Sequence, residues 1–89
     1  MIVTKNDTLK ISKLKNVKGK PDGYGNLQEY YKGFIVNLPT VGHSFSLYGD
    51  HGILTSPVTE IIEDNNFYII FKTLNSIYKL EHYNNVQNL

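Results

Sequence analysis

Short apolar segments with a two-residue period recur along the chain, and Gly, Pro and Asn residues separate them. Successive side chains of a strand point to opposite sides, so this alternation is typical of β-strands with one buried face. No internal repeat and no low-complexity linker interrupts the series. The pattern predicts strands over residues 9–12, 28–38, 44–48, 53–62, 67–71 and 77–81.

The first segment requires a choice between two structures. Leu9 and Ile11 alternate with polar residues, and the apolar positions then slip in phase to Leu14 and Val17. A strand that bulges or ends produces such a slip, whereas a short helix capped by Thr8 fits the spacing no better. We therefore expect a strand.

Turn residues connect these strands and indicate the fold class. Segment 19–26 contains Pro-Asp-Gly and is predicted to be a loop, and segment 49–52 is predicted to close a hairpin. Pro57 cannot donate to a ladder, so the strand over 53–62 should bend there or lie at an edge. Five or six short strands in 89 residues predict one all-β domain, residues 1–89. Its expected architecture is a small, strongly curved antiparallel barrel or two-sheet roll.

The strand predicted over 67–71 is apolar on both faces. Phe67, Ile69 and Phe71 occupy one face, and Tyr68 and Ile70 occupy the other. A domain this small has little core with which to cover a second apolar face. We therefore expect the Tyr68 and Ile70 face to contact another copy of the chain in a homo-oligomer.

Composition excludes several classes of function. The chain has no cysteine, so a disulfide framework, a thiolate metal site and a cysteine nucleophile are impossible. Its nine basic residues are all lysine and its formal net charge is +1. This charge disfavours broad nucleic-acid binding, and no guanidinium is present for bidentate phosphate contacts. No secretory signal and no long apolar segment is found, which predicts a cytoplasmic protein without a membrane partner.

Hydroxyl and amide side chains gather in two segments next to predicted turns. If the strands that carry them are neighbours, these groups line one pocket suited to a ribose, a base edge or a phosphate. The alternative is that they shape a corner and a turn by bonding nearby backbone. A lysine between them would supply charge. The candidate ligand-binding residues are Thr55, Ser56, Lys72, Thr73, Asn75, Ser76 and Tyr78.

Aromatic residues form 12% of the chain, enough to fill a core and also to stack on a base. Four tyrosines fall in or beside predicted loops or at outward positions, so their rings are candidates for stacking. Packing at the rim of a small barrel is the alternative. These residues are Tyr24, Tyr30, Tyr31 and Tyr48.

The three histidines do not form a recognisable metal or catalytic pattern. His43 and His51 flank one hairpin, but they and His82 lack a further ligand at a fixed spacing. Ser44 is adjacent to His43 in sequence only, which is insufficient for an activated serine. We expect neither an enzyme nor a metal or cofactor site.

Three segments of the C-terminal half carry a pattern that resembles a known group of proteins. They are residues 42–47 (GHSFSL), 55–61 (TSPVTEI) and 71–80 (FKTLNSIYKL). This half of the chain is similar to short, mostly uncharacterised proteins of phages and bacteria, in which Thr-Ser-Pro-Val and Thr-x-Asn-Ser-x-Tyr motifs recur. The resemblance implies a small barrel similar to the Src-homology-3 fold, a phage origin and, by analogy, a role against host defence.

Together these features predict a non-enzymatic, phage-type binding protein. It would act in the host cytoplasm as an oligomer and sequester a small nucleotide-like ligand, such as an immune signal. One alternative is an anti-defence inhibitor that binds a host protein through a strand edge or an apolar face. Another alternative is a small barrel that binds nucleic acid.

Overall fold

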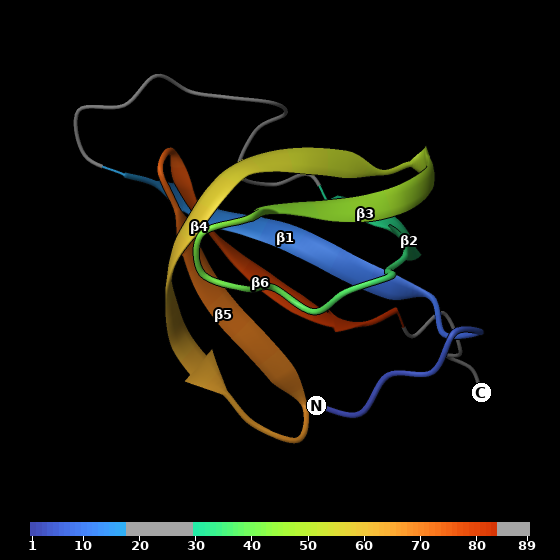
Figure 1. The fold of residues 1–89 in the computed structure, drawn as a ribbon. Helices are drawn as coiled ribbons and strands as arrows, with labels where there is room; N and C mark the ends of the chain where they lie inside the picture. Colours follow the sequence, from blue (N-terminus) through green and yellow to red (C-terminus); the bar gives the residue numbers. More distant parts are fainter. Residues whose placement is uncertain (18–29, 84–89) are drawn as a thin grey trace.

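Six antiparallel strands close into a barrel in a computed structural model of the chain (Figure 1). The structure describes residues 1–17 and 30–83, so the loop predicted at 19–26 and the segment after Tyr83 lie outside it. Each strand pairs with the next along the chain, and β6 pairs with β1 to complete the barrel. The strands are β1 (Leu9–Asn16), β2 (Tyr30–Phe34), β3 (Ser44–His51), β4 (Ile53–Asp64), β5 (Tyr68–Thr73) and β6 (Ser76–His82).

This architecture confirms the predicted all-β class and the curved antiparallel barrel. The described residues contain no helix, and thus none long and apolar enough to cross a membrane.

Strand β1 confirms the phase slip seen in the sequence, and the helical alternative is wrong. Leu9, Ile11 and Lys13 point inward, and the ladder with β6 shifts register between Lys13 and Lys15. The residue at the shift, Leu14, is exposed, as expected for a β-bulge.

The bend predicted at Pro57 is also present. Before this residue β4 pairs with β3, with Ser44 opposite Pro57, and after it β4 pairs with β5, with Val58 opposite Thr73. Figure 1 shows β4 curving around the barrel between these two partners. Because proline has no N–H to donate, it is well suited to the position where the ladder changes partner.

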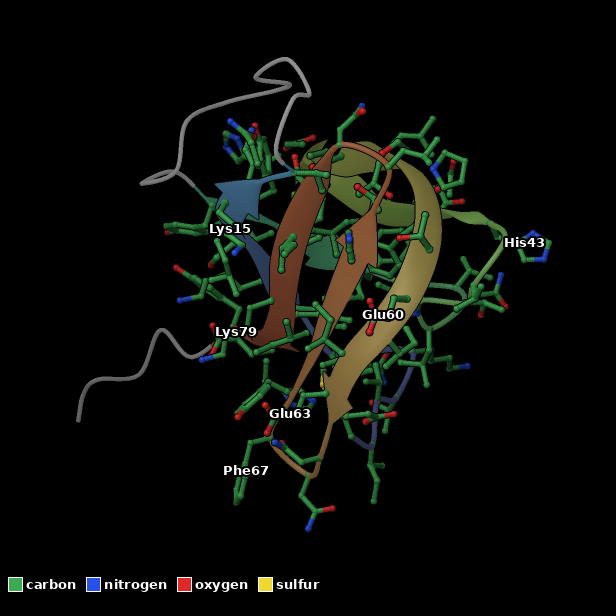
Figure 2. All side chains as sticks on the ribbon, turned by 90° about the vertical axis from the view of Figure 1, so that its left-hand side faces the viewer. Lys15, His43, Glu60, Glu63, Phe67 and Lys79 are labelled. Carbon is green, nitrogen blue, oxygen red and sulfur yellow. The ribbon has the colours of Figure 1, made fainter. Side chains whose placement is uncertain are left out.

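Two predicted strand boundaries are wrong. The strand expected to reach Leu38 ends at Phe34, because the ladder with β3 stops there, and Val36 and Leu38 are exposed. Residues 28 and 29 of that prediction lie outside the described residues. Phe67, expected to share the inner face with Ile69, precedes β5 and is 77% exposed. Figure 2 shows its ring projecting away from the barrel.

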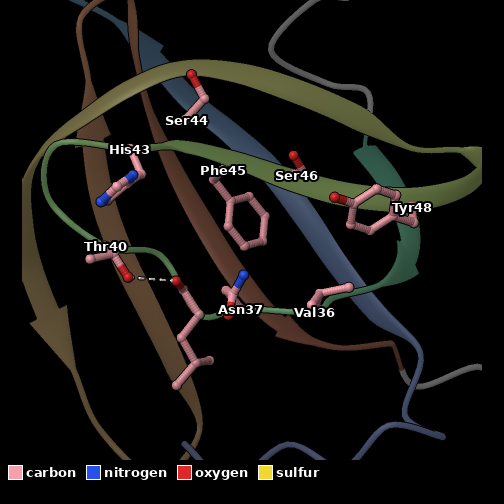
Figure 3. Close-up of a pocket in the computed structure, with 9 residues that line it drawn as sticks. Val36, Asn37, Thr40, His43, Ser44, Phe45, Ser46 and Tyr48 are labelled. Carbon is pink, nitrogen blue, oxygen red and sulfur yellow. Dashed lines mark hydrogen bonds between the residues drawn. The ribbon is translucent and has the colours of Figure 1, made fainter.

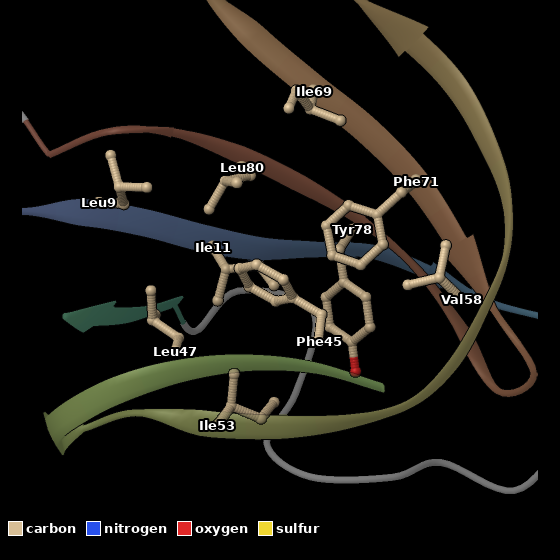
Figure 4. Packing of buried hydrophobic residues seen from close by; sticks show 10 residues of the cluster. All are labelled: Leu9, Ile11, Phe45, Leu47, Ile53, Val58, Ile69, Phe71, Tyr78 and Leu80. Carbon is tan, nitrogen blue, oxygen red and sulfur yellow. The ribbon is translucent and has the colours of Figure 1, made fainter. Parts of the chain in front are cut away.

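The core is built from the inward positions of five strands (Figure 4). Phe71 lies at its centre, with ring centroids 5.3 Å from Phe45 and 5.6 Å from Tyr78. Each fully buried side chain of this size stabilises the fold by about 1.5–3 kcal/mol. Strand β2 adds none of these residues, since its side chains are half-buried or exposed. The core residues are Leu9, Ile11, Phe45, Leu47, Ile53, Val58, Ile69, Phe71, Tyr78 and Leu80.

The outer face of β5 is only half covered. Tyr68 and Ile70 are both half-buried and point away from the core. The Tyr68 hydroxyl donates to Glu63 at 2.8 Å, and the Lys79 ammonium lies 4.7 Å from the centre of the Tyr68 ring. The apolar area here is thus bordered by charged groups, and self-association through it stays a prediction.

Candidate functional site

The structure brings the predicted hydroxyl cluster together at one end of the barrel. The turn between β5 and β6 packs against the corner of β4, where the Asn75 backbone N–H donates to Ser56 Oγ at 3.3 Å. Next to it the Leu74 N–H donates to the Pro57 carbonyl at 3.1 Å. The two segments are therefore neighbours, which is the condition under which the sequence predicts one pocket.

The hydroxyl groups of this cluster are occupied by backbone partners. Thr55 Oγ1 accepts from the Phe45 N–H at 3.0 Å and donates to the Ser56 carbonyl at 2.7 Å. Thr73 Oγ1 accepts from the N–H groups of Asn75 and Ser76 and donates to the Ser76 carbonyl. These bonds are those of the alternative in which the residues shape a corner and a turn.

The remaining candidates of the cluster differ in position. Tyr78 is buried in the core, and Ser76 is buried with its Oγ 3.5 Å from Asn16 Oδ1. Lys72 is half-buried on the outer side, opposite Glu60 in the ladder. The lysine at the inner side is Lys13, 2% exposed, which the sequence analysis missed. The two-residue alternation that places Leu9 and Ile11 inward also places position 13 inward, and this could have identified Lys13. Ligand binding by the cluster stays a prediction.

A slot elsewhere on the barrel is more open to a ligand. It lies between β3 and residues 36–40, beyond the end of β2, and has a volume of about 400 Å³ (Figure 3). Small-molecule sites have volumes of about 300–1,000 Å³, so this slot can hold a small ligand. Its apolar lining residues are Val36, Leu38, Phe45 and Tyr48, and its polar ones are Asn37, Thr40, His43, Ser44 and Ser46.

The polar lining of the slot consists of short side chains. Asn37 offers an amide, and Ser44 and Ser46 offer hydroxyls that can both donate and accept. Thr40 Oγ1 donates to the Leu38 carbonyl at 3.0 Å and retains its acceptor capacity. Apart from His43, no lining residue in the described part of the chain is ionisable near neutral pH.

Two exposed aromatic rings stand at one end of this slot. Phe34 on β2 and Tyr48 on β3 are ladder partners whose rings stack with centroids 5.7 Å apart and planes 29° apart. They are 49% and 46% exposed. Gly49, which follows Tyr48, has a φ of 143°, a conformation that favours glycine. Tyr48 is one of the rings predicted to be available for stacking, whereas Phe34 falls within the strand predicted over 28–38 and had no predicted role.

The other predicted rings have three different outcomes. Tyr30 is 47% exposed and its ring stacks on Tyr83 at 6.2 Å, so its role in stacking on a ligand stays a prediction. Tyr31 packs against the core, as in the alternative of rim packing. Tyr24 lies outside the described residues.

A second cavity, of about 650 Å³, adjoins the slot across Tyr48. It is lined by ionisable side chains as well as by Tyr48 and Phe34. Asp7 is held by two donors: the Thr4 N–H at 2.9 Å and His82 Nε2 at 3.1 Å. The hydrogen bond from the Thr4 backbone, followed by that from His82, lowers the pKa of Asp7 below its ordinary value. Its acidic and basic lining residues are Lys5, Asp7, Lys32, Asp50 and His51.

The three histidines are distributed over different surroundings. His43 lines the slot, His51 lines the second cavity, and His82 pairs with Asp7. Within residues 1–17 and 30–83, no group of three or more His, Asp or Glu residues could hold a metal ion.

Comparison with protein-family models, with curated proteins and with solved structures found no match to this chain. The resemblance to phage and bacterial small barrels therefore stays a prediction, and the slot is interpreted from its own chemistry.

Proposed function

We propose that the protein is a non-enzymatic binding protein for a small nucleotide-like ligand, held at the slot with its base against Tyr48. The observation that carries this proposal is the exposed Phe34 and Tyr48 ring pair, next to a slot lined by uncharged hydrogen-bonding groups. Half-exposed stacked rings on a barrel surface offer a flat apolar face. A nucleobase has such a face, and its polar edge matches amide and hydroxyl groups.

The expected energies are sufficient for useful affinity. Stacking of one base on an aromatic ring contributes about 1–3 kcal/mol, and each neutral hydrogen bond contributes about 0.5–1.5 kcal/mol. Micromolar affinity corresponds to about 8 kcal/mol. A stacked base and several bonds from Asn37, Thr40, Ser44 and Ser46 approach this value, so no single residue suffices.

The biological role that we propose is sequestration of an immune signalling nucleotide by an oligomer of a phage-type protein. Support comes from the resemblance of the C-terminal half and from a slot whose lining suits binding more than bond cleavage. A sequestering protein needs affinity and abundance but no catalytic group, so one small domain of 89 residues is sufficient for this role.

Isothermal titration calorimetry tests the proposal with a panel of nucleosides, cyclic nucleotides and ADP-ribose derivatives. At least one member should bind, and Tyr48→Ala should lower its affinity by about tenfold or more, the loss of one stacking contact. Tyr30→Ala is the matched control, because Tyr30 is equally exposed and also stacks on another ring. Absence of heat with every member, or equal losses in both variants, would contradict the proposal.

One observation favours a second candidate function, inhibition of a host defence protein through a strand edge. The ladder between β2 and β3 ends at the pair of Phe34 and Tyr48, so residues 44–47 of β3 have described ladder partners on the β4 side only. An extended peptide could add to this edge, with Val36 and Leu38 contacting alternate side chains. This candidate would be favoured if a purified host protein binds the native chain but not Ser46→Pro, while small ligands give no heat.

A further inference from the structure

The second cavity, beside the slot, carries charged side chains that the proposed contact between the base and Tyr48 does not involve. Tyr48 lines both spaces, which therefore adjoin at this side chain. The slot has no lysine in its described lining, whereas Lys5 and Lys32 line the cavity. Thr8 and the backbone of Gly33 and Gly49 also border it. One side of the ring pair therefore suits an uncharged group, and the other suits an anion.

The balance of charge limits the anion that fits. Against the two lysines stand Asp7 and Asp50, of which Asp7 already accepts from the Thr4 N–H and His82. Lys32 is held with its ammonium 4.7 Å from the centre of the Tyr83 ring, at the edge of the cavity. The two lysines and two aspartates balance, so the lining has no net positive charge to hold a phosphomonoester with two negative charges. Because Asp7 is already engaged by its own donors, a phosphodiester with one negative charge is the better match for Lys5 and Lys32.

Resting on the function proposed above, we infer that the ligand is a nucleoside phosphodiester that spans both spaces. Its base lies in the uncharged slot against Tyr48, and its phosphate lies in the cavity near Lys5 and Lys32. Hydrogen bonds from lysine to a phosphate are charge-assisted and are about twice as strong as neutral ones. The phosphate thus adds affinity, and the slot selects the base.

Calorimetry tests the inference with three probes for each purine base, namely the nucleoside, its 3′,5′-cyclic monophosphate and its 5′-monophosphate, and with inorganic phosphate. The cyclic nucleotide should bind about tenfold more tightly than the nucleoside, the gain from one charge-assisted hydrogen bond. Lys32→Met should lower affinity for the cyclic nucleotide several-fold more than affinity for the nucleoside, while Lys5 still faces the phosphate. Lys79→Met is the matched control, because Lys79 lies at the same distance over a tyrosine ring outside the cavity.

The charge limit has its own test. Asp50→Asn should raise affinity for the 5′-monophosphate more than for the cyclic nucleotide, since it removes a repulsion that grows with ligand charge. Tighter binding of the monophosphate than of the cyclic form by the native protein would overturn the phosphodiester assignment. Equal affinities for nucleoside and cyclic nucleotide would overturn this inference and leave the proposed function standing. Absence of binding by every one of these probes, for both purine bases, would overturn the inference. Binding of another member of the panel of nucleosides, cyclic nucleotides and ADP-ribose derivatives would still uphold the proposed function.

Discussion

A side chain at Gly33 would collide with the backbone carbonyl oxygen of Tyr48. Strands β2 and β3 thus approach so closely at this point that only glycine fits on β2. The residue after Gly33 is Phe34, which stacks on the Tyr48 ring. The same close approach that shapes the barrel wall therefore also brings the two exposed rings together.

Gly33→Ala should destabilise the protein and separate the ring pair. The added methyl meets backbone, which cannot rotate away, so the strands must move apart at a cost of about 1–3 kcal/mol. Thermal unfolding should show a lower midpoint. Nucleotide affinity should fall even at temperatures where the variant is fully folded.

Gly42→Ala is the contrasting variant. Its φ of 94° favours glycine, but an added Cβ would meet no atom within 4 Å. We expect a loss of about 1 kcal/mol from backbone strain alone and unchanged ligand affinity. An unaltered midpoint in Gly33→Ala would show that the strands separate at little cost.

Thr73→Val should distinguish the two roles considered for the hydroxyl cluster. The Thr73 hydroxyl accepts from the N–H groups of Asn75 and Ser76, and valine leaves these donors without that partner. The expected loss of stability is about 1–3 kcal/mol, measured by urea unfolding. Thr59→Val is the control, because its exposed hydroxyl makes a single bond to the Lys72 carbonyl.

Ligand affinity of the same variants completes this test. If the cluster only shapes the turn, folded Thr73→Val binds as the native protein does. Lost affinity in a variant of native stability would instead assign the ligand to Thr55, Ser56, Thr73 and their neighbours, and would contradict the placement at Tyr48.

The fold could be predicted from sequence because its determinants are local. Each strand pairs with the next, so two-residue alternation and turn residues specify most of the barrel, and Pro57 marks its corner. The slot could not be predicted in this way. Alternation continues through Val36 and Leu38, but the ladder with β3 ends at the pair of Phe34 and Tyr48. Only the three-dimensional arrangement reveals that these residues line a hollow.

Stability should depend on the ionisation of Asp7 in acid. Hydrogen bonds from the Thr4 backbone and from His82 lower the pKa of Asp7 in the folded state. A lowered folded-state pKa means that the ionised carboxylate stabilises the fold above the unfolded-state pKa, about 3.9. This contribution is lost as the pH falls from there through the folded-state value.

Thermal midpoints of the native protein and Asp7→Asn, measured from neutral pH to strong acid, check this dependence. The native protein should be the more stable at neutral pH, and the difference should disappear in acid. His82→Ala should reduce the difference without abolishing it, because the Thr4 bond is the larger cause of the shift. A constant difference across the range would show that Asp7 acts by its shape alone.

Self-association should depend on the outer face of β5. Tyr68 and Ile70 are half-buried there, and the strongly exposed Phe67 precedes them at the end of the β4–β5 hairpin. We expect an oligomer by size-exclusion chromatography with light scattering, since burial of these side chains offsets the entropy lost when two chains associate.

Ile70→Thr should dissociate this oligomer, because threonine retains strand propensity while it lowers the apolar area. Ile77→Thr is the matched control, because Ile77 is also half-buried and lies at an outward position of the neighbouring strand β6. If both variants keep the native mass, the contact lies elsewhere; if the native chain is a monomer at high concentration, the half-exposed β5 face is simply tolerated.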